Sequence, residues 1–276
     1  MSERELYPAG VPCWVETLQP DPLTALDFYG RLFGWEFVGP GSMPGDPPGK
    51  YFVARVRGRD VAGIGSLLHG SGLPAPTWIT HIRVDSADQA AEKAKTAGGS
   101  LRGGPIDALP AGRLAVLADP AGALVCVWEA RDREGAELVN EPRAWAMSLL
   151  HTIDPETSKA FYGAVFGWQP EAFGPPEAQV TLWRLPGYVG GEPQQPVPRD
   201  VVSVMTLTGG DGSGGAGPSH WSVDFWVDDA DATAVHAAEL GGKVIVPPHN
   251  RPGFRSALLA DSQGAVFSVS HLAAGH

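Results

Sequence analysis

Four side chains that could transfer protons fall on predicted strands, two in each half of the chain. Glu16 lies in an apolar strand near the N-terminus and His81 in a later one. Strand alternation places both on faces that also carry aromatic residues. A carboxylate and an imidazole held together there could act as general base and acid on a bound molecule. A surface glutamate and a hydrogen-bonded structural histidine remain the alternative interpretation.

The corresponding strands of the second half carry His151, Ser222 and Asp224. We expect His151 and Asp224 to be able to orient one another and to transfer protons. Ser222 is a candidate ligand-binding residue. These residue types do not indicate a hydrolase, because no Gly-x-Ser-x-Gly motif places a serine at a strand-to-helix turn.

Aromatic and sulfur-containing residues accompany these polar groups, and we expect them to bind a ligand. They are Trp14, Cys126 and Trp128 in the first half and Met147, Trp183 and Trp226 in the second. Packing of Trp14 and Trp128 in a collapsed core is the alternative. If the strand registers are right, these two face a cavity, while Val15 and Val127 face a helix.

The elements that must position these residues occur twice. Residues 28–35 and 161–168 are identical at six of their eight positions. Further matches follow in the same order, at residues 84–88 and 227–231, then 119–123 and 261–265. A repeat of this length indicates two whole domains, because solenoid repeats run to roughly 20–50 residues. We predict domains at 1–133 and 141–276, joined by a polar linker.

Within one half, the patterns predict strands alternating with two helices. In the first half, Asp21-Pro22 and Gly34 mark the ends of the first helix, and a second begins near Ala87. The predicted strands are residues 13–18, 50–57, 61–68, 78–84, 113–118 and 123–128. We therefore expect an α+β fold in which each domain has two βαβββ modules. Each module should form an open four-stranded sheet with its helix on one face, and the two should curl around a cavity.

Composition restricts the possible partners. The 276 residues carry a net charge of −11, which disfavours nucleic acid and anionic lipid surfaces. No apolar run is long enough to span a bilayer, and the N-terminus lacks a signal-peptide core. Two cysteines allow no disulfide framework. We expect a cytoplasmic monomer or homodimer with a small-molecule ligand, without nucleic-acid or membrane partners.

The order of these motifs resembles the vicinal-oxygen-chelate superfamily of glyoxalases, bleomycin-resistance proteins and extradiol dioxygenases. The resemblance rests on Asp-Pro before a helix ending in Phe-Tyr-Gly-x-x-Phe-Gly-Trp, then Val-Asp-x-Ala-Asp, then Asp-x-x-Gly-Ala before the last strand. It covers both halves, and the sequence looks most similar to the tandem hydroxylase-like and glyoxalase-like members of actinobacteria. It implies two curled mixed sheets, each around a cavity.

The resemblance also implies where metal ligands would lie, on the first, fifth and last strands of each domain. Counting from the motifs gives Trp14, Ile79 and Cys126 in the first half and Met147, Ser222 and Ser268 in the second. A register shifted by two gives Glu16, His81 and Trp128. None of these is a typical ligand set for a hard metal ion, so we expect no metal and no other cofactor.

We therefore expect a metal-independent binding protein of the bleomycin-resistance kind, for a partly aromatic metabolite or antibiotic. The alternative is a glyoxalase-like lyase or a hydroxylase acting on a dicarbonyl or an aromatic polyketide, with proton transfer by the four acid–base candidates. A noncatalytic interaction protein is also compatible with the fold. Because Glu16 aligns with Leu149 and His81 with Asp224, we expect the two halves to bind different groups.

Overall fold

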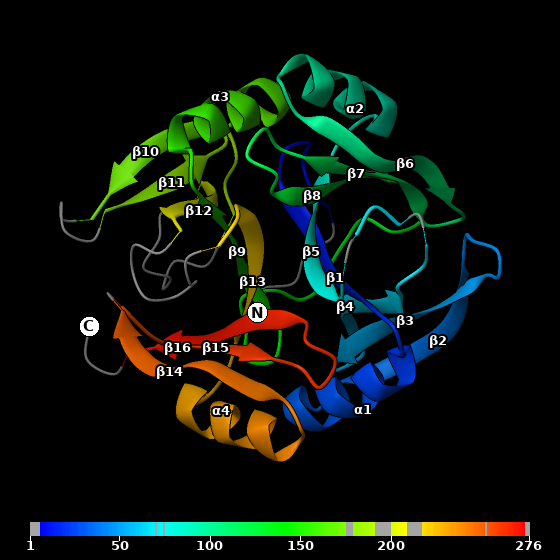
Figure 1. The fold of residues 1–276 in the computed structure, drawn as a ribbon, viewed down its shortest axis with the longest axis vertical. Coiled ribbons are helices and arrows are strands. Elements are labelled where there is room, and N and C mark those ends of the chain that lie inside the picture. The colour runs from blue at the N-terminus through cyan, green and yellow to red at the C-terminus, as the bar shows by residue number, and fades with distance from the viewer. Residues whose placement is uncertain are drawn as a thin grey trace.

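The two halves of the chain form two α+β domains, each built on one curled eight-stranded sheet (Figure 1). The structure is a computed structural model, and it describes residues 6–69, 71–73, 75–174, 179–190, 200–208, 217–251 and 253–273. Domain 1 lies on the right of Figure 1 and domain 2 on the left. Within the described ranges, no helix has the length and apolar character needed to cross a bilayer.

Domain 1 contains two βαβββ modules joined edge to edge. The elements are β1 (Pro12–Gln19), α1 (Pro22–Phe33), β2 (Glu36–Met43), β3 (Gly49–Val56), β4 (Arg59–Ser66), β5 (Thr77–Arg83), α2 (Ala87–Thr96), β6 (Ser100–Ala108), β7 (Gly112–Ala118) and β8 (Leu124–Ala130). The strand order is β2-β3-β4-β1-β5-β8-β7-β6. Because β1 pairs directly with β5, the two expected four-stranded sheets are halves of one continuous sheet.

Domain 2 repeats this architecture strand for strand. Its elements are β9 (Trp145–Thr152), α3 (Pro155–Phe166), β10 (Gln169–Phe173), β11 (Val180–Arg184), β12 (Val201–Leu207), β13 (His220–Trp226), α4 (Ala230–Glu239), β14 (Lys243–Arg251), β15 (Phe254–Ala260) and β16 (Val266–Leu272). The order β10-β11-β12-β9-β13-β16-β15-β14 matches that of domain 1. The duplication in the sequence is therefore a duplication of the fold.

Local chemistry explains where the helices begin and end. The side chain of Asp21 accepts a hydrogen bond from the backbone N–H of Leu23, with Pro22 in the first turn of α1. Asp154 caps α3 in the same way. Gly34 and Gly167 end the two helices in the left-handed conformation, at φ of 69° and 75°. These are the helix limits that the sequence predicts.

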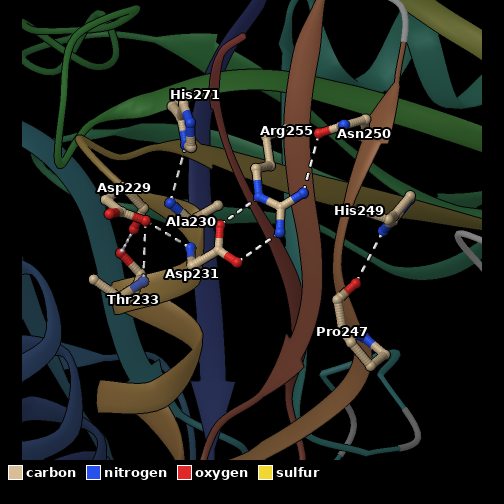
Figure 2. A network of polar contacts seen from close by, with 10 residues as sticks. Asp229, Ala230, Asp231, Thr233, Pro247, His249, Asn250, Arg255 and His271 are labelled. Atoms are coloured by element: carbon tan, nitrogen blue, oxygen red, sulfur yellow. Dashed lines mark hydrogen bonds and ion pairs between the residues drawn. The ribbon is translucent and has the colours of Figure 1, made fainter. Parts of the chain in front are cut away.

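The start of α4 is held by a polar network (Figure 2). Asp229 accepts hydrogen bonds from the backbone of Asp231 and Ala232, and the guanidinium of Arg255 pairs with both carboxylate oxygens of Asp231. Domain 1 has the matching pair, because Arg113 binds both oxygens of Asp88 at the start of α2. The repeated Asp and Arg positions of the sequence thus fix each second helix to its sheet.

The outer faces of the two sheets meet in the middle of the molecule. In Figure 1, α1 lies beside α4 and α2 beside α3, and β5 of domain 1 packs near β13 of domain 2. Aromatic rings fill this interface, with Trp78 and Phe225 only 4.8 Å apart between ring centres. We define the inner face of each sheet as the face turned away from these helices and from the other domain.

The repeated sequence motifs bind each other across this interface. Tyr29 Oη donates to Asp261 Oδ2 at 2.9 Å, and reciprocally Tyr162 Oη donates to Asp119 Oδ2 at 3.1 Å. Trp35 Nε1 also donates to a backbone carbonyl of the other domain. The Phe-Tyr-Gly and Asp-x-x-Gly motifs therefore join the two domains, in addition to ending a helix and forming a turn.

Candidate functional site

The inner face of domain 1 brings together the candidate acid and base. Trp14 and Glu16 come from β1 and His81 from β5, where Trp14 pairs opposite His81. On the other side of β5, His81 pairs with Cys126 of β8. Because alternate residues of a strand share a face, these four side chains point to the same side of the sheet.

A chain of polar contacts joins three strands on this face. Trp14 Nε1 donates to Tyr51 Oη at 2.9 Å, and Tyr51 Oη donates to Glu16 Oε2 at 2.6 Å. The other carboxylate oxygen, Oε1, lies 3.1 Å from His81 Nε2. We call this set, Trp14, Tyr51, Glu16 and His81, the domain 1 relay. The contact to His81 is an ion pair when the imidazole is protonated, and within the described residues neither ring nitrogen makes a well-aligned hydrogen bond.

The relay is buried, and its charges stabilise each other. Burial raises the pKa of Glu16, but His81, Tyr51 and Trp14 outweigh this effect and leave that pKa below its usual value. Burial lowers the pKa of His81, whereas Cys126 and Glu16 raise it, and the result is a pKa of about 10. At neutral pH the pair is therefore a carboxylate beside an imidazolium, with His81 only 1% exposed.

Tyr51 belongs to the relay although the sequence analysis did not identify it. Its ring has room because β4 carries glycine at two successive inner-face positions, Gly63 and Gly65. A Cβ added at Gly63 would lie 2.0 Å from Tyr51 Oη, and one added at Gly65 would lie 2.9 Å from the ring. This Gly-x-Gly in a strand was the available signal, since strand glycines mark close approaches.

Trp14 and Trp128 flank the relay. The rings of His81 and Trp128 meet edge to face at 6.0 Å, and the guanidinium of Arg133 lies 5.3 Å from the centre of the Trp14 ring. Arg133, which the sequence analysis did not identify, is held by Asp60 at 2.6 Å. Val15 and Val127 are fully buried, but Trp14 and Trp128, only 4% and 7% exposed, belong to the same core cluster. The strand register confirms that the two tryptophans share the face of His81, whereas packing in the core, the alternative interpretation, also fits their burial.

Domain 2 separates the two groups that we expected to interact. His151 lies opposite His220 and Asp224 opposite Met147, so His151 and Asp224 are four positions apart along β9, roughly 13 Å. His151 Nε2 instead lies 2.9 Å from Ser222 Oγ, and its ring stacks on His220 with centres 4.7 Å apart. The mutual orientation of His151 and Asp224 was therefore a wrong expectation, because it ignored the length of the strand between them.

Asp224 has an environment of serine hydroxyls. Ser270 donates to Oδ2 of Asp224, and Ser268 also stabilises the carboxylate. The hydrogen bonds from the two serines and the charge of Arg251 lower the pKa of Asp224. Burial has the larger effect and raises that pKa to about 6. Asp224 is thus a buried carboxylate that changes charge near neutral pH.

The remaining candidates of domain 2 lie on two different faces. Met147 and Trp226 share the inner face with Asp224, and the Trp226 ring meets Phe254 edge to face at 6.4 Å. Trp183 is fully buried on the opposite face, where its ring packs 5.8 Å from both Tyr162 and Trp168. The structure therefore gives Trp183 a packing position, because the register of β11 turns it toward α3.

The expected metal positions carry Trp14, Ile79 and Cys126 in domain 1 and Met147, Ser222 and Ser268 in domain 2, which are not side chains that hold a hard metal ion. Over the described parts of the chain, no group of three or more His, Cys, Asp and Glu side chains is arranged to hold one. In domain 1, both oxygens of Glu16 are already engaged by Tyr51 and His81. In domain 2 the carboxylate of Asp224 is hydrogen-bonded by Ser268 and Ser270, and serine is a poor ligand for the divalent metals bound by histidine and carboxylate.

Comparison with known proteins matches this architecture. A family model described as a glyoxalase-like domain matches residues 14–128 and again 146–270. "Putative glyoxylase CFP32" of Mycobacterium bovis is 37% identical, over 98% of this chain and 97% of that protein. "Anthracycline biosynthesis protein DnrV" of Streptomyces peucetius is 34% identical, over 98% and 96%. The Mn(II)-bound glyoxalase of Novosphingobium aromaticivorans has a similar fold, with a TM-score of 0.60 at 14% identity, over 95% of this chain and 82% of that one.

Proposed function

This chain belongs to the glyoxalase-like domain family, and from that premise we propose that it binds a small, partly aromatic metabolite or antibiotic without a metal ion. The domain 1 relay is the observation that carries the proposal. It holds a charged pair between Trp14 and Trp128, on two of the strands where the resemblance implies metal ligands. Aromatic walls with a few fixed polar groups are the usual composition of a site for a planar ligand.

The relatives support an aromatic polyketide as the ligand class. Two relatives over nearly the full chain are named as anthracycline biosynthesis proteins, and anthracyclines contain a planar fused-ring system with carbonyl and hydroxyl groups. Both tryptophan rings are buried, so such a ring must displace neighbouring groups to stack on Trp14 or Trp128. Its hydroxyl and carbonyl groups can exchange hydrogen bonds with Tyr51 and Glu16.

A second candidate is an enzyme of the glyoxalase-like lyase or hydroxylase type. The ionised pair of Glu16 and His81 favours it, because an imidazolium can donate a proton to a carbonyl oxygen while a carboxylate accepts one from carbon or oxygen. The burial of His81 means that a substrate must displace part of the relay to reach it. Both candidates use the same residues and differ only in whether the bound molecule changes.

A thermal-shift experiment on chelator-treated protein tests the proposal. We expect an anthracycline aglycone to raise the melting temperature, because a ligand that binds the folded state stabilises it by mass action. Glu16→Gln should reduce the shift, while Glu36→Gln, an exposed glutamate on β2, should not. No shift, or an equal shift in both variants, would contradict the proposal. Chromatography of the aglycone, and of methylglyoxal in a parallel sample, then shows whether either compound is converted.

A further inference from the structure

The inner face of domain 2 presents different chemistry from that of domain 1. Strand pairing matches Glu16 with Leu149 and His81 with Asp224, since each pair occupies the same place on β1 and β9 or on β5 and β13. The neighbour on the last strand changes from Cys126 to Ser268. Domain 2 therefore has an acidic residue, Asp224, where domain 1 has His81, and a leucine where domain 1 has Glu16.

Among the described residues, no basic side chain lies as close to Asp224 as His81 does to Glu16. Only 8% of the residue is exposed, and its close partners are the hydroxyls of Ser268 and Ser270. Arg251, on the edge strand β14, acts on it electrostatically. His151 and His220 lie toward the other end of β9 and β13. Hydroxyls solvate a carboxylate only in part, so a buried charge of this kind gains when a cation binds beside it.

Beyond its two serine partners, the inner face near Asp224 carries apolar and aromatic residues. Met147 lies directly opposite it on β9, and Trp226 follows two residues later on the same face. Trp226 and Phe254 form an edge-to-face pair, and both are only partly buried. Aromatic faces attract organic cations and pack against planar groups, so the same patch suits both ends of an aromatic amine.

We propose that the inner face of domain 2 is a separate binding site for an aromatic amine, with Asp224 as the counter-ion of its ammonium group and Trp226 against its ring. The charge of Asp224 favours an amine over a neutral alcohol of the same shape, since an alcohol satisfies a hydrogen bond but leaves the charge uncompensated. The site shares no residue with the domain 1 relay. Its existence therefore does not depend on what domain 1 binds.

Calorimetric titration of the full chain with tryptamine and with tryptophol tests this site. The two probes share an indole ring and differ in an ammonium against a hydroxyl group. At pH 8 Asp224 is ionised, and we expect tryptamine to bind at least about tenfold more tightly than tryptophol, a ratio that corresponds to about 1.4 kcal/mol. Asp224→Asn should remove this preference by weakening tryptamine alone. Asp228→Asn, an exposed aspartate before α4, is the matched control and should keep it.

Three results would overturn the proposal. They are absence of tryptamine binding, equal affinity for the two probes in the unmodified protein, and an unchanged preference in Asp224→Asn. The comparison of probes in the unmodified protein needs no variant to fold. A thermal shift with the anthracycline aglycone that responds to Glu16→Gln would still support domain 1 in any of these cases, so the two proposals fail independently.

Discussion

At the scale of single residues, Gly63 determines whether the domain 1 relay can form. Its Cβ position is occupied by the hydroxyl of Tyr51, 2.0 Å away. We predict that Gly63→Ala displaces Tyr51 and lowers the free energy of unfolding by about 1–3 kcal/mol, as overpacking does in a filled interior. Urea denaturation measures this. Gly41→Ala is the control, because its added Cβ would lie 3.7 Å from its nearest neighbour, and equal losses from both variants would refute the prediction.

Asp224 should make stability depend on pH in a specific direction. Its pKa is raised on folding from 3.8 to about 6, so the folded state holds the proton more tightly than the unfolded state. The ionised carboxylate of Asp224 therefore destabilises the folded state, by nothing below pH 3.8 and by about 3 kcal/mol above pH 6. Asp224→Asn should therefore raise the free energy of unfolding, relative to the unmodified protein, by more at pH 8 than at pH 4.5. The free energy of unfolding at both pH values measures this, and a difference independent of pH would contradict it.

Sequence alternation was sufficient to select Glu16, His81 and Asp224, because a strand exposes every second residue on one face. It could not identify Tyr51 or Arg133. Tyr51 lies on β3, which β4 separates from β1 in the sheet, and Arg133 lies in the linker, with its guanidinium over the Trp14 ring. Nor could it separate His151 from Asp224, since membership of one face says nothing about distance along the strands.

At the scale of elements, helices were predictable and edge strands were not. The helices begin and end with local signals such as Asp21 and Gly34, which act within a few residues. The edge strands β2 and β6 are interrupted by glycine and proline and are largely exposed, so they lack the apolar pattern of a strand. Their backbone groups pair with those of β3 and β7.

The interdomain hydrogen bonds provide a prediction at this scale. Tyr162→Phe removes the donor hydroxyl of a buried contact and Asp119→Asn removes the negative charge of its acceptor, and we expect a double-mutant cycle to give a coupling of about 1 kcal/mol or more. Denaturant unfolding of the four proteins measures it. Tyr162→Phe combined with Asp261→Asn, which belongs to the opposite contact, should be additive. Additivity in the first cycle would show that the contact does not hold the domains together.

At the scale of the whole molecule, the two domains share their strand order and their interdomain contacts but differ in the residues of their inner faces. The motifs that repeat most closely are those that join the domains, such as Tyr29 with Asp261 and Tyr162 with Asp119. The inner faces differ, with an ion pair in domain 1 and a carboxylate among serines in domain 2. This division explains why the family could be recognised from the sequence while the ligands could not, since fold does not determine function.

The central claim is that binding requires no metal, and calorimetric titration of an anthracycline aglycone before and after chelation tests it most directly. The metal content of each sample is measured in parallel. We predict the same affinity in both samples, with far less than one metal ion per chain, because the relay has no free ligands. About one ion per chain, together with loss of binding on chelation and its recovery on adding Mn²⁺, would contradict the account.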